Sequence, residues 1–250
     1  MLIEELTSTK ATKLIGKIDT LLLPVGTLEA HGPHCSVASD ILIPVRIAQE
    51  VEKLAGDRVF VAPVIPYGHN FHLLHAPGTH NVPNDVFSDY VYQVLRGFLT
   101  WKIRYAVILN GHGGNAHGLH HAAERACDSG IKTVVLSWWE SGFEERIRGV
   151  VEDVGGHAGE SETSLLWFVG DRYVDSSLIP KEPNPIDFGK GRTVASYMDT
   201  YDSELNRRIF PKAYSGNPAA GTKEKGARLN KILAKGLVEV IDALRAGQLM

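Results

Sequence analysis

Short runs of β-branched and aliphatic residues alternate along the chain with longer segments in which apolar residues recur at helical spacing. This alternation is typical of an α/β fold with a mainly parallel β-sheet flanked by helices on both faces. The predicted strands cover residues 20–25, 59–65, 105–109 and 132–137. The predicted helices cover residues 41–54, 84–100, 116–129, 143–151, 161–169 and 221–244, with Asp40 expected as the N-cap of the first and Asn84 or Asp85 as that of the second.

The pattern contains no linker that would divide the chain, so we expect one domain over residues 1–250. A long loop rich in Gly, His and Pro covers residues 67–83. Residues 175–218 are the least regular stretch and hold most of the remaining prolines, which favours a subunit-contact arm or a partial lid.

The composition narrows the class of protein. Hydrophobic residues make up 44% of the chain, which supports a sizeable core, and the formal net charge of -3 gives no basic face for nucleic acid. The two cysteines form no CxxC pair, the first residues lack the basic start of a signal peptide, and no apolar run is long enough to cross a bilayer. We therefore expect a cytoplasmic protein without nucleic-acid or membrane partners.

The first candidate site follows the first predicted strand. Glu29 and His31 are two residues apart, so an extended backbone projects both side chains to one side. Asp40 comes from the start of the next helix. This mixture of carboxylate and imidazole suits Zn, Mn or Fe(II) more than calcium, although taken alone a solvated surface pair is the more common explanation.

The second candidate is the segment Asn110-Gly-His-Gly-Gly-Asn115, between a predicted strand and a predicted helix. Its glycines allow close approach of the backbone to a ligand, His112 is expected at the tip of the turn, and the two asparagines are expected to fix the loop. A phosphate-binding turn is the alternative, but neither GxGxxG nor GxxxxGK[ST] is present.

The third candidate is the segment 155–164, in which two glycines lead to His157 and a helix then begins with two glutamates. Glu160 alone is readily explained by the helix dipole or a capping box. Glu162 precedes an apolar run, and a buried carboxylate needs a partner charge that a metal ion would supply.

These three segments, in this order, resemble the creatininase (creatinine amidohydrolase) family. The matching stretches are LPVGTLEAHGPH with Asp40, LNGHGGN at 109–115 and GGHAGESETS at 155–164, and two weaker ones lie at 66–79 and 216–226. The resemblance implies an α/β hydrolase, commonly a homohexamer, with two divalent ions: zinc, with manganese, zinc or iron at the second position. It assigns metal ligation to Glu29, His31, Asp40 and His112, with Asp40 bridging, and proton movement to His157.

One departure concerns the residues after His112. Creatinine-hydrolysing members carry a Tyr-Glu pair there, and its Glu is a ligand, whereas this chain has Gly113-Gly114. We expect Glu162 to supply the missing carboxylate, as in a Gly-Gly branch of the family that shares the ETS segment. Creatinine itself is therefore a doubtful substrate.

Substrate contacts are expected from three further residues, and a second catalytic residue is considered. Trp138 and Trp139 would offer a flat wall for a small ring, although adjacent tryptophans are at least as often core residues. His72 lies on the 67–83 loop that could shape the pocket. Glu160 is considered as a residue that orients His157 or as an alternative base.

The predicted function is a metal-dependent hydrolase in which activated water attacks a cyclic amide, an amide, a formamide or a related small-ring carbonyl. The alternatives are a hydrolase that opens an oxidised inositol ring and a metal-dependent sugar isomerase or lyase. A metal-stabilised binding protein is the alternative without catalysis.

Overall fold

The computed structural model describes residues 1–140, 142–152, 156–184 and 203–248. The strands are β1 Thr20–Val25, β2 Phe60–Val61, β3 Tyr105–Asn110 and β4 Lys132–Ser137. The α-helices are α1 Ser8–Leu14, α2 Ser39–Ala55, α3 Asn84–Gly97, α4 Ala116–Asp128, α5 Glu144–Arg148, α6 Glu160–Val169, α7 Ser203–Ile209 and α8 Lys223–Ala246.

The four strands form a parallel sheet in the order β2-β1-β3-β4. In the register of the sheet, Val25 lies opposite Asn110, which in turn lies opposite Ser137, so β1, β3 and β4 end at the same level. From β1 the chain crosses to β2 on one side, whereas from β3 it crosses to β4 on the other. Loops that leave two neighbouring strands in opposite directions open a crevice between them, and ligands of open α/β sheets bind there.

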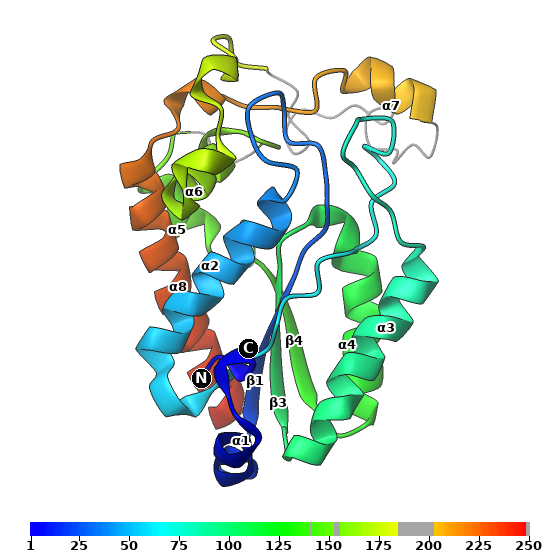
Figure 1. Ribbon diagram of the computed structural model, residues 1–250, viewed down its shortest axis with the longest axis vertical. Helices are drawn as coiled ribbons and strands as arrows, with labels where there is room; N and C mark the ends of the chain where they lie inside the picture. The colour runs from blue at the N-terminus through cyan, green and yellow to red at the C-terminus, as the bar shows by residue number, and fades with distance from the viewer. Residues whose placement is uncertain (141, 153–155, 185–202, 249–250) are drawn as a thin grey trace.

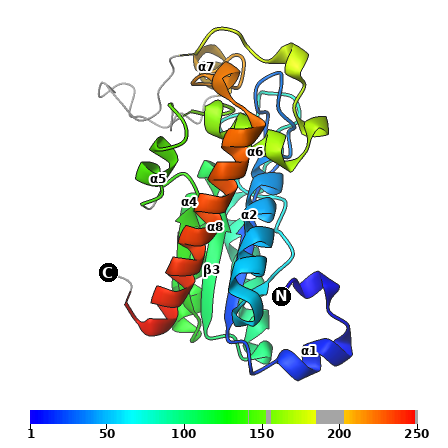
Figure 2. The same ribbon diagram turned by 90° about the vertical axis from the view of Figure 1, so that its left-hand side faces the viewer.

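Helices cover both faces of the sheet, as predicted (Figure 1). The helices α2, α5, α6 and α8 lie on one side, and α3 and α4 lie on the other (Figures 1 and 2). Successive side chains of β1 enter opposite layers: Leu22 belongs to the cluster shared with α2 and α8, while Leu21 and Leu23 belong to the cluster shared with α3 and α4. A strand buried on both faces explains the uninterrupted apolar run of β1.

Two predicted elements differ from the structure. The second strand is limited to Phe60–Val61, because Pro63 and Pro66 lack the amide hydrogen that strand pairing needs, and beyond it only Ile65 forms an isolated bridge to Val25. The prediction of Asp40 as N-cap is wrong. Helix α2 begins at Ser39 after Ala38, so Asp40 lies inside the first turn with its carboxylate available for other contacts.

The other differences are small. Helix α3 begins at Asn84 directly after Pro83, so neither Asn84 nor Asp85 is its N-cap. Helix α1 was not predicted; it is short and buries none of its side chains, so the hydrophobic pattern gave no signal for it. Within the described residues, no helix combines the length and apolar character needed to cross a membrane.

Candidate metal centre

The candidate residues of all three sequence segments meet at the carboxyl end of the sheet. Glu29 and His31 lie on the loop after β1, and Asp40 lies in the first turn of α2. His112 follows β3, and Glu162 lies in the first turn of α6. The ends of β1 and β3 and the starts of α2 and α6 therefore bring together three carboxylates and two imidazoles from positions up to 133 residues apart in the sequence.

One group of three potential ligands comprises Glu29, Asp40 and His112. His112 Nδ1 lies 3.2 Å from Glu29 Oε2 and 2.9 Å from Asp40 Oδ2. All three side chains are buried. One carboxylate oxygen from each acid thus faces one imidazole nitrogen, which is a ligand set that zinc and manganese accept.

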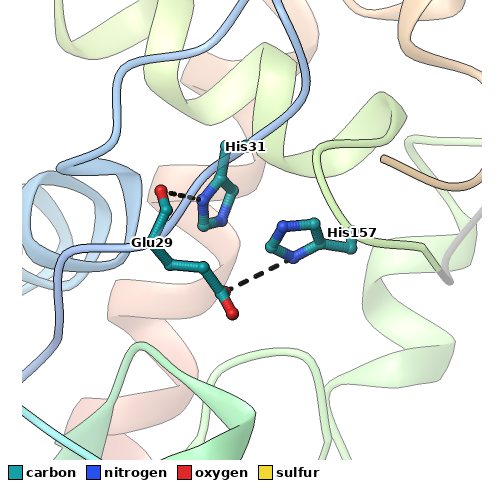
Figure 3. A group of neighbouring side chains, drawn as sticks. All are labelled: Glu29, His31 and His157. Atoms are coloured by element: carbon teal, nitrogen blue, oxygen red, sulfur yellow. Dashed lines mark hydrogen bonds and ion pairs between the residues drawn. The ribbon is translucent and has the colours of Figure 1, made fainter. Parts of the chain in front are cut away.

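A second group comprises His31, Asp40 and Glu162. His31 Nε2 lies 3.0 Å from Asp40 Oδ1 and 3.7 Å from Glu162 Oε2. The other ring nitrogen of His31, Nδ1, lies 3.0 Å from the carbonyl oxygen of Glu29 (Figure 3). Since a carbonyl only accepts, Nδ1 carries a proton, and Nε2 is the ring nitrogen that faces the carboxylates. Metal-binding histidines are commonly oriented by this type of contact.

Asp40 belongs to both groups, one oxygen to each. Despite these short distances, neither His31 Nε2 nor Asp40 Oδ2 has a hydrogen-bond partner within the described residues. Buried polar atoms are normally hydrogen-bonded. Atoms that are close together but misaligned for hydrogen bonds are the arrangement expected of ligands around a cation, so the donor set of the two groups fits divalent metal.

His157 lies at the edge of this cluster (Figure 3). Its Nδ1 is 3.6 Å from Glu29 Oε2, and its ring centroid is 4.1 Å from that of His31. Its Nε2 donates to the carbonyl of Ala30 at 2.7 Å, which assigns the ring proton to Nε2 and leaves Nδ1 facing the cluster. His157 also forms a third group of potential ligands with Glu29 and His31.

The loop that carries His112 is fixed as predicted by its two asparagines. Asn110 Oδ1 accepts from the backbone N–H of His112 at 3.0 Å, and Asn115 Nδ2 donates to the carbonyl of Gly26 at 3.3 Å. Gly111 allows α2 to approach, because a β-carbon there would lie 2.2 Å from the Asp40 carbonyl oxygen. The β3 loop and the start of α2 can therefore be close enough for His112 and Asp40 to meet.

The same loop has no room for a side chain at Gly114. A β-carbon at this position would lie 2.5 Å from both His112 Nε2 and the carbonyl oxygen of His69. Contacts this short require the neighbours to move. The second carboxylate of the group with His31 and Asp40 is that of Glu162, whose Oε2 accepts from the backbone N–H of Ala158 at 2.5 Å.

The negative charges of the cluster raise the pKa values of two of its histidines. Burial opposes the charged form of His31, but the carboxylates of Asp40, Glu162 and Glu29 outweigh it and raise the pKa of His31 to about 10. For His112, burial is likewise outweighed by Glu29 and Asp40, which raise its pKa to about 10. Without metal ions, the cluster therefore retains protons as its counter-charges.

The pKa values of the three carboxyl groups are shifted in different directions. Burial opposes ionisation of Asp40, yet His31 and His112 lower its pKa well below the usual range. The pKa of Glu29 is lowered too, because His112 and His157 outweigh its burial. For Glu162, burial dominates over His31 and His157 and raises the pKa. Of the three acids, Glu162 is thus the one whose charge is least compensated by the protein.

The remaining predicted site residues lie outside this cluster. Trp138 is 2% exposed and packs in the core cluster with α2 and α8, and Trp139 is partly buried against the same cluster. His72 is exposed on the 67–83 loop. Glu160 is fully buried, and its carboxylate accepts from Lys225 and from the backbone N–H of Glu152. These placements favour the core alternative for Trp138, and the substrate-binding and catalytic roles of these residues stay predictions.

Two further contacts of the site were not found from the sequence. Ser215 accepts from the backbone N–H of His157 at 2.8 Å and returns its own N–H to the carbonyl of His157 at 2.7 Å. Lys225 pairs with Glu160 across 65 residues. Ser215 lies in the irregular stretch 175–218, of which residues 185–202 lie outside the described residues, and no local pattern connects it to His157. The only sequence signal for Lys225 is its place in the weakly similar stretch at 216–226.

The fold and this cluster define the chain as an α/β protein with a divalent-metal centre at the end of its sheet. The family model Creatininase, described as creatinine amidohydrolase, matches residues 4–241, so the chain belongs to the creatininase family and is a metal-dependent hydrolase. The resemblance predicted from the sequence is thereby confirmed at the level of the family.

Individual relatives have different activities. The chain is 33% identical to a 3-dehydro-scyllo-inosose hydrolase of Thermotoga maritima over 98% of the chain and 78% of the relative. It is 27% identical to a creatinine amidohydrolase of Pseudomonas putida over 88% of each chain. A solved creatininase structure, described as a Mn form, superposes with a TM-score of 0.81 over 98% of both chains at 24% identity, a likeness that concerns the fold.

Proposed function

We propose that the chain hydrolyses a C–N bond next to a carbonyl in a small substrate such as a cyclic amide, an amide or a formamide. The observation that carries the proposal is the pair of three-residue groups that share Asp40. Two divalent ions would be held by Glu29, His31, Asp40, His112 and Glu162. Ions bound there would lower the pKa of water and polarise the substrate carbonyl.

The protein groups around the ions have distinct tasks. The buried carboxylates and the imidazoles of His31 and His112 would fix the positions of the ions relative to the substrate. His157 would accept a proton on Nδ1 and deliver it to the leaving nitrogen, because its Nε2 is tied to Ala30 and its Nδ1 faces Glu29. Unlike His31, whose side chain is fully buried, the side chain of His157 is 16% exposed, so a substrate atom can approach it.

A second candidate is the opening of an oxidised inositol ring. It is supported by the 33% identity to the 3-dehydro-scyllo-inosose hydrolase of Thermotoga maritima, which is higher than the identity to the Pseudomonas creatininase. The burial of Trp138 also favours it, since a core tryptophan offers no open face for stacking a flat ring.

The test combines metal analysis with an activity screen. Protein stripped by a chelator and reloaded with Zn²⁺ or Mn²⁺ is assayed on creatinine, formamides and keto-inositols in ¹⁸O water. Solvent ¹⁸O in the product indicates hydrolysis, whereas turnover without ¹⁸O indicates the isomerase or lyase alternative. Stripping that unfolds the protein would support the non-catalytic, metal-stabilised protein instead.

The matched variant is Asp40→Ala. It is expected to lose metal and at least about 10³-fold in activity together, because Asp40 serves both groups. The control is Asp242→Ala, which removes an exposed partner of Arg58 far from the cluster and should retain both properties. Full metal content in Asp40→Ala would remove the proposal.

The finer expectations from the family resemblance are proposals as well. They are zinc with manganese, zinc or iron at the second position, a homohexamer, a cytoplasmic location and one domain over residues 1–250. The family match over residues 4–241 supports the single domain. Metal analysis of protein purified without added metal and light scattering of that sample test the ions and the assembly.

A further inference from the structure

Glu160 joins three segments of the chain through one carboxylate. Its Oε1 accepts from Lys225 Nζ in the first turn of α8 at 2.5 Å. Its Oε2 accepts from the backbone N–H of Glu152 at 2.9 Å. Because Glu160 is itself the first residue of α6, the starts of α6 and α8 and the stretch that leads to His157 are all connected at this point.

Burying the pair of Glu160 and Lys225 costs free energy. The side chain of Glu160 is 0% exposed and that of Lys225 is 25% exposed. Removing two charges from water costs several kcal/mol per ion, and a well-packed apolar pair of similar volume is often as stable. Stability alone therefore does not explain the pair. Lys225 Nζ also donates to the carbonyl of Ala220 at 3.0 Å, so the lysine is held on both sides.

The segment that the pair anchors contains strained backbone next to His157. Ala158 adopts a left-handed φ of 51°, which is unfavourable for a residue with a β-carbon. The N–H of Ala158 donates to Glu162, and the backbone of His157 is held by Ser215. Strained backbone persists only where surrounding contacts determine it, and Glu160, two residues after Ala158, adds its contacts with Glu152 and Lys225 to them.

We propose that Glu160 and Lys225 are positioning residues that hold the start of α6, and with it the preceding residues 156–158, so that Nδ1 of His157 faces Glu29. Glu160 thus acts on His157 through the backbone of residues 157–160. The catalytic consequence of this inference rests on the proposed function, whereas its structural part does not.

The structural part is tested in the Zn²⁺-loaded full chain by amide hydrogen exchange. Lys225→Met is expected to speed exchange at the amides of His157 and Ala158 about tenfold, because the loop loses its anchor. Lys223→Met is the matched control. Lys223 pairs with Asp171 at the same end of α8, but both partners are exposed. Exchange at the amides of His157 and Ala158 should therefore be unchanged in Lys223→Met. Equal exchange in both variants would overturn the proposal.

Lys225→Arg keeps a cation and should restore slow exchange relative to Lys225→Met. If Lys225→Met does not fold, Glu160→Gln is measured in the same way, with the same expected direction. Zinc content is determined in parallel and is expected to stay at the level of the unmodified chain, because neither Glu160 nor Lys225 belongs to the two ligand groups.

The catalytic part is tested by a double-mutant cycle with His157→Gln on the substrate that the activity screen identifies. Lys225→Met should lower kcat roughly 10- to 100-fold in the unmodified chain but less than about 3-fold when His157 is already replaced. A merely structural role would give equal losses in both backgrounds, and this result would overturn the catalytic part. If no substrate is turned over, the proposed function fails, and hydrogen exchange still decides whether the loop is anchored.

Discussion

Two glutamates at the start of α6 lie two residues apart and have opposite surroundings. Glu160 is paired with the ammonium group of Lys225 and a backbone N–H. Glu162 accepts one backbone N–H, and the groups that offset its charge are His31 and His157, so burial dominates and its pKa is raised. The protein thus provides Glu160 with a permanent cation and Glu162 with imidazoles alone.

This difference separates a structural carboxylate from a ligand. A buried acid that is satisfied by its own protein has no need of an ion, whereas one that is left under-compensated beside other carboxylates attracts a cation. The comparison explains why two similar glutamates in one turn of helix have different roles. It also makes the roles testable, because the same substitution at both positions should have different consequences.

The largest expected effect of this kind is on metal binding. Glu162→Gln should weaken the binding of one zinc ion by at least about 100-fold, because it removes a ligand of the second group. Glu160→Gln should bind both ions as the unmodified chain does. Competition with a chromophoric chelator measures both variants. Equal zinc affinity in the two variants would contradict the distinction between them.

The next effect is the pH dependence of metal binding. His31 and His112 have a pKa of about 10 without metal, so both hold a proton at pH 7.5 that metal ligation must displace. Affinity should therefore rise with pH between 6 and 9, by about tenfold per pH unit for each proton released. Calorimetric titration with Zn²⁺ in two buffers of different ionisation enthalpy counts these protons. Heats that do not depend on the buffer would rule out the displacement.

A smaller effect, of opposite sign at the two positions, is expected on the stability of the metal-free protein. Burial raises the pKa of Glu162. The ionised form of Glu162 therefore destabilises the metal-free fold once the pH exceeds the pKa of a free glutamate. Glu162→Gln should therefore raise the melting temperature at pH 7.5 by about 2 to 4 °C. Glu160→Gln should lower it, because Lys225 loses its partner. The same sign for both variants would be inconsistent with the comparison.

The smallest effect concerns His34. Its Nε2 lies 3.0 Å from the hydroxyl of Thr163, the residue that follows Glu162 in α6. Burial, together with the charges of His31 and His157, lowers the pKa of His34 to about 4. A histidine with a lowered pKa stabilises the fold above its unfolded pKa of 6.5, and this contribution is lost as the pH falls below it. Metal-free protein should lose about 1 kcal/mol more between pH 7.5 and 5.5 than His34→Gln. Parallel unfolding curves at both pH values provide the measurement.

The sequence predicted those parts of the fold that depend on local pattern. The bounds of β1 and β4 agree with the alternation of apolar runs, because these strands are buried along their length or at the end that enters the core. The second strand was overestimated, since apolar character continues past Pro63, whereas continuous pairing ends at Val61 and only the bridge at Ile65 follows. Asp40 was expected to cap a helix because short acids often do, but its contacts with His31 and His112 lie outside any local pattern.

The ligand groups were predictable because each segment has its own motif, and the parallel sheet brings strand ends together. By contrast, the supports of His157 were not predictable. Ala30 contacts it from 127 residues away through a backbone carbonyl that any residue type possesses. Ser215 contacts it from 58 residues away through its hydroxyl and its backbone N–H, and serines are too common for this one to be singled out. The core position of Trp138 likewise depends on how α8 packs, which the chain near Trp138 does not specify.

The level ends of β1 and β3 impose an order on how the centre matures during synthesis. The group of Glu29, Asp40 and His112 is complete once the ribosome has released the turn after β3 and that strand has paired with β1. The group of His31, Asp40 and Glu162 must wait a further 50 residues until α6 emerges and docks. In a nascent polypeptide, the ligands of one coordination position are therefore all synthesised before those of the other.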